Sequence, residues 1–245
     1  MNKFVKALLI TLAVIACIVL IPPMILKSRI DGLADTKKAE NITDTSLAFE
    51  STYEIKEGDI TMQVPTYYAS TKLSKFSAVM CASQQQQKEL MIIYYPFGPV
   101  ADTIMPGYSD QLDRMFDEYE NAKPGPPWNM FVEVPEDVFE VMREVCLADK
   151  NTFDFWNFKH SLSLYYYLAA RQHVAETQSD FSFSGIYERD DIRAVSVQDL
   201  TNKDTYVVMI FPKNDPETIY AFVISTKDMD DITKLLNTFD YNSLF

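Results

Sequence analysis

The hydrophobic pattern of the chain begins with a run of twenty residues, 7–26, in which no side chain is charged. A helix rises about 1.5 Å per residue, so such a run is long enough to cross the ~30 Å apolar core of a bilayer. A short basic segment, 1–6, precedes it. The pattern predicts a transmembrane helix. We expect Pro22 and Pro23 to kink or fray its end, because neither has an amide hydrogen to donate.

Three interpretations of this run are open: an uncleaved anchor, a cleaved signal peptide and a lipoprotein signal. Cleavage after Ala16 would leave the apolar stretch 18–21 close to the new N-terminus. The segment 14–17 resembles a bacterial lipoprotein box, with Cys17 as the lipidated residue. We favour the uncleaved anchor. A basic start followed by an apolar run favours an extracytoplasmic location for the rest of the chain, although basic residues also follow the run.

The residues after this run divide into a tether and one domain. Polar and charged residues without apolar periodicity fill 27–46, which is typical of a polar tether. Apolar periodicity starts near Leu47, and the length of 47–245 suits a single domain. Within this domain, 108–176 shows the helical spacing of apolar residues, whereas its flanks show the pattern of strands.

Strands are predicted on both sides of the helical region. The first two flank a turn in which Gly58 can supply a positive φ. The last four are joined by short turns, which predicts an antiparallel meander. Two of these, 206–211 and 219–224, are apolar on both faces, as in strands at the centre of a covered sheet. The expected strands are 53–56, 60–64, 76–82, 90–95, 181–187, 192–197, 206–211 and 219–224.

Helices are predicted where apolar positions recur three and four residues apart. One begins at Ser109, and a second has Pro135 in its first turn. A third runs over about 161–175, with Leu162, Tyr165, Tyr166 and Ala169 expected toward the core. The last follows a capping-box spacing between Ser225 and Asp228. Its buried stripe should contain Ile232, Leu235, Leu236 and Phe239. Together these elements predict an α+β fold, with an N-terminal transmembrane helix followed by an antiparallel sheet packed with helices.

Both ends of the predicted domain resemble a known family. The segment 58–65, GDITMQVP, looks like the opening strand of the PsbP-like α/β sandwich group, which also runs into a proline. The strand 220–224 and the helix that closes on 236–239 are similar to the ending of the same group. The resemblance includes no catalytic motif. It implies a noncatalytic domain that is located in the cell envelope or linked to assembly.

The net charge of the predicted domain limits the classes of molecule that can be its partners. The chain has 22 basic and 35 acidic residues. Four of the basic residues and none of the acidic ones precede Ile30, which leaves 18 basic against 35 acidic residues, a net charge of −17. Such a charge repels nucleic acid and anionic lipid, so neither is expected as a partner. It increases solubility, and it also suits an acidic face that binds a cationic protein.

The residues needed for common catalytic centres are sparse. Six glycines, no two closer than nine residues, exclude the loops of nucleotide-binding proteins and the nucleophile elbow. On one helix, His160 and His173 would point to opposite sides, so we expect no shared metal and no cofactor. Paired carboxylates keep acid–base hydrolysis open as an alternative. They are Glu136 with Asp137, Asp190 with Asp191, and Asp228 with Asp230 and Asp231.

Two further features suggest binding or cross-linking. Prolines stiffen the segment before Trp128, so Trp128, with Pro126 and Pro127, is a candidate anchor for a protein partner. Cys81 and Cys146 are candidates for one disulfide of an exported domain, with buried free thiols as the alternative.

Taken together, these patterns predict a membrane-anchored, noncatalytic envelope protein whose domain binds a protein partner, with 7–26 as the membrane contact. A hydrolase that uses carboxylates is one alternative. A small-ligand carrier is another, and it would need an aromatic-lined pocket. The helix that carries the three tyrosines 165–167 is where such a pocket is expected.

Overall fold

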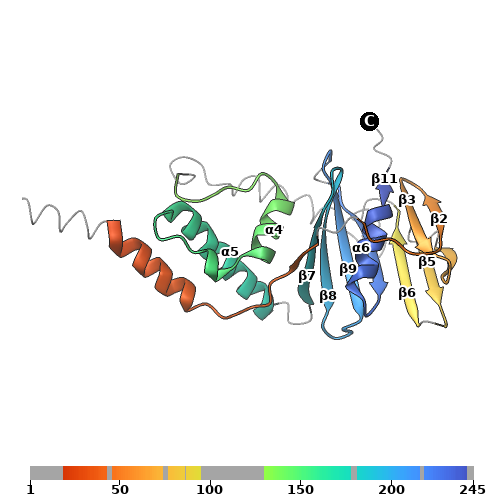
Figure 1. The fold of residues 1–245 in the computed structure, drawn as a ribbon, viewed down its shortest axis with the longest axis horizontal. Helices are drawn as coiled ribbons and strands as arrows, with labels where there is room; N and C mark the ends of the chain where they lie inside the picture. The colour runs from red at the N-terminus through yellow and green to blue at the C-terminus, as the bar shows by residue number, and fades with distance from the viewer. Residues whose placement is uncertain are drawn as a thin grey trace, which may run out of the picture.

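The computed structural model describes residues 19–42, 46–73, 77–85, 87–94, 130–177, 181–215 and 218–241. Within these ranges an eight-stranded sheet, a three-stranded sheet and several helices pack together (Figure 1), so the predicted α+β class is confirmed. Figure 1 shows α4 (Val138–Leu147) and α5 (Phe158–Thr177) at one end of the molecule and the three-stranded sheet at the other.

The large sheet contains the predicted meander. Strands β7 to β10 are neighbours in chain order and pair antiparallel, and the doubly apolar β9 and β10 lie in the interior of the sheet, as predicted. One pair, β1 with β7, is parallel, so the sheet is mixed. In spatial order its strands are β1 (Glu40–Ile42), β7 (Phe181–Glu188), β8 (Ile192–Asp199), β9 (Thr205–Pro212), β10 (Tyr220–Ser225), β6 (Lys88–Ile93), β5 (Ala78–Ser83) and β4 (Ala69–Leu73).

Two layers cover opposite faces of this sheet. Successive side chains of a strand alternate between faces, so Ala194 and Val195 of β8 belong to different cores. Ala194 lies in the larger cluster, beneath helix α6 (Met229–Thr238) and strand β3 (Ile60–Pro65). Val195 lies in a second cluster with Phe139 of α4. The small sheet pairs β3 with β2 (Thr52–Glu57) and β11 (Asp240–Tyr241).

Helix α6 buries the predicted stripe, but its cap differs from the prediction. Asp228, not Ser225, is the N-cap, and its carboxylate accepts a hydrogen bond from the Asp230 amide at 3.0 Å. Ser225 is still paired in β10, so its backbone cannot begin the helix. The four predicted apolar side chains are all buried, namely Ile232, Leu235, Leu236 and Phe239.

The turn between β2 and β3 confirms the role expected for Gly58. Its φ is +56°, a left-handed value that favours glycine. A Cβ at this position would lie 2.5 Å from Cδ2 and 2.7 Å from the carbonyl oxygen of Tyr94. The close approach lets the Asp59 amide donate to the Tyr94 carbonyl at 3.3 Å, which ties the small sheet to the segment that follows β6.

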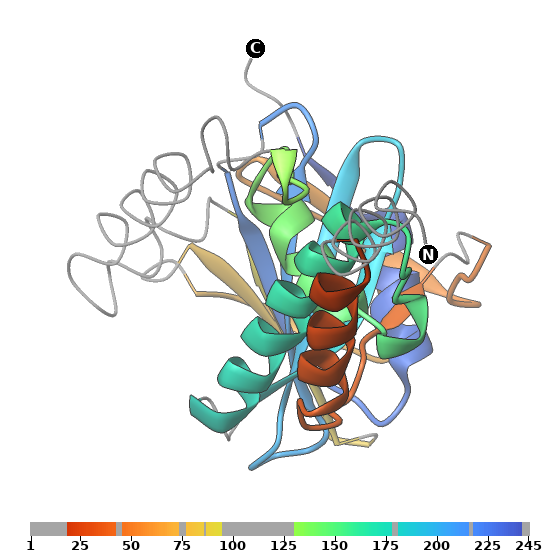
Figure 2. The ribbon, with the colours of Figure 1, turned by 90° about the vertical axis from the view of Figure 1, so that its left-hand side faces the viewer.

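The N-terminal segment is ordered against the domain. Residues 19–31 are helical through both Pro22 and Pro23, and this helix lies beside α5 (Figure 2). Its Leu26 and Ile30 side chains are buried in a cluster with residues of α5. Strand β1 then pairs with β7. The prediction of a polar tether is therefore wrong over 27–42. Widely spaced apolar residues and backbone pairing hold this segment, and neither leaves a periodic pattern.

Residues 1–18, which hold most of the predicted span, lie outside the described residues. In the ranges that the structure describes, no helix has both the length and the apolar character needed to cross a membrane.

Helix α4 (Val138–Leu147) begins later than predicted. Asp137 is its N-cap and accepts from the Glu140 amide at 3.0 Å, whereas Pro135 precedes the helix. The helix docks on β8 through the buried Arg193, whose Nη1 lies 2.8 Å from the Asp137 carboxylate. The same guanidinium lies 4.7 Å above the ring centroid of Phe139. The cationic side chain of Arg193, on the sheet, thus contacts both the N-cap carboxylate of Asp137 and the ring of Phe139.

Helix α5 (Phe158–Thr177) confirms the third predicted helix but not its predicted core face. Ser161, Leu164, Leu168 and Arg171 are buried, while Tyr166 is 56 % exposed. A short 3₁₀ helix, η3 (Lys150–Thr152), connects α4 with the turn before α5. The helix predicted to begin at Ser109 lies outside the described residues.

Candidate functional site

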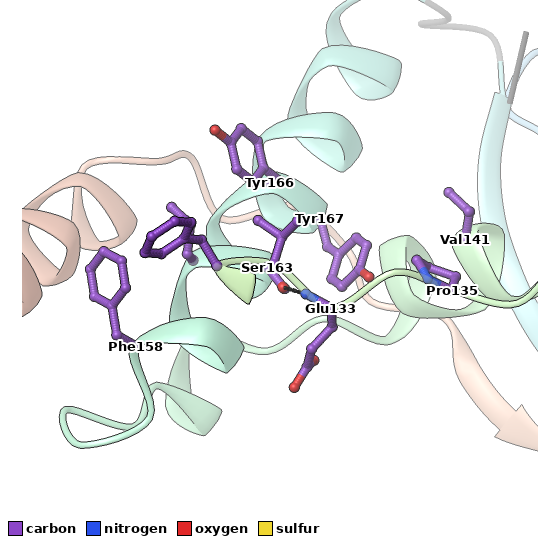
Figure 3. A pocket seen from close by; sticks show the side chains of 10 residues that line it. Glu133, Pro135, Val141, Phe158, Ser163, Tyr166 and Tyr167 are labelled. Carbon is purple, nitrogen blue, oxygen red and sulfur yellow. Dashed lines mark hydrogen bonds between the residues drawn. The ribbon is translucent and has the colours of Figure 1, made fainter. Parts of the chain in front are cut away.

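A cavity of about 700 Å³ lies between α5, α4 and the segment 131–135 (Figure 3). Most of the described side chains that line it are apolar. They include Phe131, Val132, Pro135, Phe158, Leu162 and Tyr166. We call this cavity the aromatic pocket. Its size and composition are typical of sites that bind small apolar ligands.

Helix α5 can line a pocket because it has apolar side chains on two faces. Phe158, Leu162 and Tyr166 are spaced by four residues and so lie along one face of the helix, which borders the pocket. Leu164 and Leu168 lie on another face and pack in a cluster with Leu26 and Ile30 of the N-terminal helix. A helix that is apolar on several sides must be covered on several sides. The N-terminal helix covers one face, and the pocket occupies the other.

Hydrogen bonds fix the wall of the pocket opposite α5. The buried Ser163 hydroxyl accepts from the Glu133 amide at 2.7 Å and donates to the Lys159 carbonyl at 3.0 Å (Figure 3). The Glu133 carboxylate also lies 3.5 Å from Nδ1 of His160. One serine therefore couples the backbone at Glu133 to the first turns of α5.

An acidic hollow adjoins the aromatic pocket. Its volume is about 400 Å³, and the two cavities share Glu133, Pro135 and Tyr167. Four carboxylates line the hollow, those of Glu133, Glu136, Glu140 and Glu144.

Two arginines compensate part of this negative charge. Arg143 is 3.0 Å from the Glu140 carboxylate, and Arg193 is 3.5 Å from it. Burial raises the pKa of Glu144, and the neighbouring carboxylates of Glu140 and Glu133 raise it further, although Arg143 acts in the opposite direction. A raised pKa means that the negative charge of Glu144 is poorly stabilised. The hollow therefore favours a cationic or neutral group over an anionic one.

The proline-flanked anchor predicted from the sequence, Pro126, Pro127 and Trp128, lies outside the described residues.

The two cysteines considered for a disulfide, Cys81 and Cys146, are both free and buried. Cys81 belongs to the core beneath α6, and Cys146 to the core beneath α4, on the opposite face of the large sheet. Packed layers lie about 10 Å apart, and a disulfide needs Cα atoms within about 7 Å. The suggested Cys81–Cys146 disulfide is therefore not formed.

Each group of carboxylates considered for hydrolysis contains at least one with a structural contact. Asp137 and Asp228 cap helices. Asp191 pairs with the Arg189 guanidinium at 2.5 Å, and the buried Asp231 pairs with Lys88 at 2.5 Å. Among the residues that the structure describes, no group of three or more His, Cys, Asp or Glu side chains is arranged to hold a metal ion.

The prediction of a pocket at the tyrosine helix is partly confirmed. Tyr166 and Tyr167 line the aromatic pocket, whereas Tyr165 does not and packs against the cluster that contains Leu26 and Ile30. The sequence interpretation missed Phe158, although its spacing of four and eight residues from Leu162 and Tyr166 places it on the same face. It also missed the 131–135 segment, whose contact with α5 leaves no local signal.

No family model, curated protein or solved structure matches the chain. The aromatic pocket and the acidic hollow beside it therefore provide the argument for function.

Proposed function

We propose that this protein is a membrane-anchored, noncatalytic binding protein that holds the apolar part of a ligand in the aromatic pocket. The observation that carries the proposal is the cavity of about 700 Å³ with its phenylalanine, leucine and tyrosine lining. Ligand sites of this kind have volumes of about 300–1,000 Å³, apolar walls and few polar groups.

The acidic hollow adds a preference for the polar end of the ligand. A ligand that fills the aromatic pocket places its head group near Glu133, which belongs to both cavities. Four carboxylates in one hollow repel a carboxylate or phosphate head and attract an ammonium group. The preferred ligand is therefore an apolar molecule with a neutral or cationic head.

The anchor remains the uncharged run 7–26, with the domain outside the cytoplasm. The resemblance of 58–65 and 220–239 to PsbP-like domains supports the same noncatalytic role in the envelope. A protein partner is the second candidate. The exposed side chains of Met130 and Phe131, at the edge of the pocket segment, favour it, because exposed apolar residues beside a groove are common anchors for partners.

Displacement of a neutral fluorescent probe, Nile red, from the full-length protein in detergent micelles tests the ligand proposal. We expect dodecylamine and dodecanol to displace the probe better than dodecanoate. Leu162→Trp fills the pocket and should abolish probe binding, whereas Ala170→Trp, on an exposed position of the same helix, should not. Thermal unfolding of both variants checks that they are folded. Equal probe binding by the two variants would contradict the proposal.

A further inference from the structure

The N-terminal helix has two unlike faces. Pro23, Leu26 and Ile30 are buried toward the domain. The outward face carries a row of exposed apolar side chains, with Met24 61 % exposed. The other members of this row are Leu20, Ile21 and Ile25. Such a concentration of exposed apolar residues is unusual for a surface in water and indicates a contact.

The chemistry of what covers this face follows from its place in the chain. Residues 19–25 belong to the uncharged run 7–26, and Lys27 is the first charged residue after it. If the run spans the bilayer, residues 19–25 form its last two turns and Lys27 marks its boundary. Because Leu26 and Ile30 pack in the same cluster as Leu164 and Leu168, the end of the span is fixed to α5 rather than linked to it by a flexible tether.

Trp156 lies on the same side of the domain. It occupies the turn before α5 and is 78 % exposed, with its ring 5.0 Å from that of Phe155. Three residues earlier, the Phe153 ring lies 5.6 Å from Nζ of Lys27. Trp156 is thus held near the level at which the uncharged run ends. Tryptophan is enriched at this depth because its ring is amphipathic.

We propose that the helical end of the domain docks onto the lipid bilayer through a contact surface made of the outward face of 19–25 and Trp156. The contact is apolar, so it requires no anionic lipid, which the acidic domain would repel. Phe158, two residues beyond Trp156, lines the aromatic pocket and places one end of that pocket beside the bilayer. The inference rests on the proposed anchor, 7–26.

Tryptophan fluorescence tests the docking directly, because the chain has only two tryptophans. Trp128→Phe leaves Trp156 as the single reporter in the full-length protein, reconstituted into phosphatidylcholine vesicles. We expect phosphatidylcholine brominated near the glycerol end of its acyl chains to quench Trp156 strongly, and acrylamide in the aqueous phase to quench it weakly. The matched control adds Trp156→Phe and Lys56→Trp, which moves the reporter to exposed β2 at the opposite end of the molecule (Figure 1). The control should show the reverse pattern.

Flotation of the vesicles separates the two possible failures. If the protein floats with the vesicles but Trp156 behaves like the β2 reporter, the anchor holds and the docking surface is wrong. If the protein does not float, both the anchor and the docking are wrong. Quenching of Trp156 by brominated lipid, with the β2 reporter unaffected, supports the docking. Quenching by brominated lipid only near the methyl ends of the chains would place Trp156 too deep and would also overturn the proposed interfacial contact.

Discussion

The guanidinium of Arg171 holds three parts of the helical layer together, and its removal is the most informative change in stability. It is 7 % exposed, and its Nη1 donates to the carbonyls of Cys146 at 3.1 Å and Ala148 at 2.8 Å, with the Val145 carbonyl at 3.4 Å. Its Nε donates to Oγ1 of Thr36 at 2.8 Å. Arg171 therefore links α5 to the end of α4 and to the segment that leads into β1.

Arg171→Met keeps the apolar stem and removes these donors. A hydrogen bond from a charged donor contributes about 1.5–3 kcal/mol, and a buried carbonyl left without a donor costs about 1–3 kcal/mol. Removing the buried charge offsets part of this loss. Burial lowers the pKa of Arg171, which shows that the charged form carries a desolvation cost. We expect the free energy of unfolding to fall by about 2–4 kcal/mol.

Urea unfolding of the full-length protein in micelles, followed by circular dichroism, measures this change. With a urea dependence of about 2–3 kcal/mol per molar, the midpoint should fall by about 1 M. Arg143→Met is the matched control, because Arg143 forms a more exposed ion pair with Glu140 in α4. Its removal should lower the free energy of unfolding by less than about 1 kcal/mol. Hydrogen exchange should also quicken in β1. Equal midpoints for the two variants would refute the proposed role of Arg171.

Two further predictions concern titrating groups, namely two buried thiols and one partly exposed carboxylate. Burial raises the pKa of Cys81 to about 11 and of Cys146 to about 12. In a Cys17→Ser background, neither thiol should react with a disulfide reagent at about pH 8 until the protein is unfolded. Rapid labelling of the folded protein would contradict this. Hydrogen bonds from Arg189 lower the pKa of Asp191 below its ordinary value of 3.8, so the stability that the Asp191 carboxylate contributes is fully present above that pH and is lost as the pH falls through the lower folded value. Asp191→Asn should therefore flatten the acid limb of urea midpoints measured against pH. An unchanged limb would show that Asp191 does not cause it.

Patterns within a few residues were enough to predict much of the sheet and the last helix. Strands β7 to β10 have short polar turns between apolar runs, so each neighbour in sequence is also the neighbour in space. The stripe that ends at Phe239 follows the helical period and is buried as expected. Gly58 also predicted the turn between β2 and β3, because glycine is favoured where φ is positive.

Elements that are held by contacts with residues far away in the sequence have a weak local sequence pattern or none. Strand β1 gains its hydrogen bonds from β7, more than a hundred residues away, and its own sequence, Glu-Asn-Ile, has no strand signature. The cap of α6 moved from Ser225 to Asp228 because β10 continues through Ser225. The core face of α5 was misassigned because this helix is apolar on more than one side, and periodicity cannot tell which side a neighbour will cover.

The sequence by itself determined the α+β class, the order of the central strands, the net acidity of the domain and the uncharged run 7–26, because each depends on composition or on the local period of apolar residues. Only the tertiary structure brought Phe131 and Val141 to Phe158 to form the aromatic pocket, and four glutamates to the hollow beside it. It also packed Leu26 and Ile30 onto α5. These contacts join segments that are far apart in the chain, so their geometry is set by packing between elements, which no local pattern encodes.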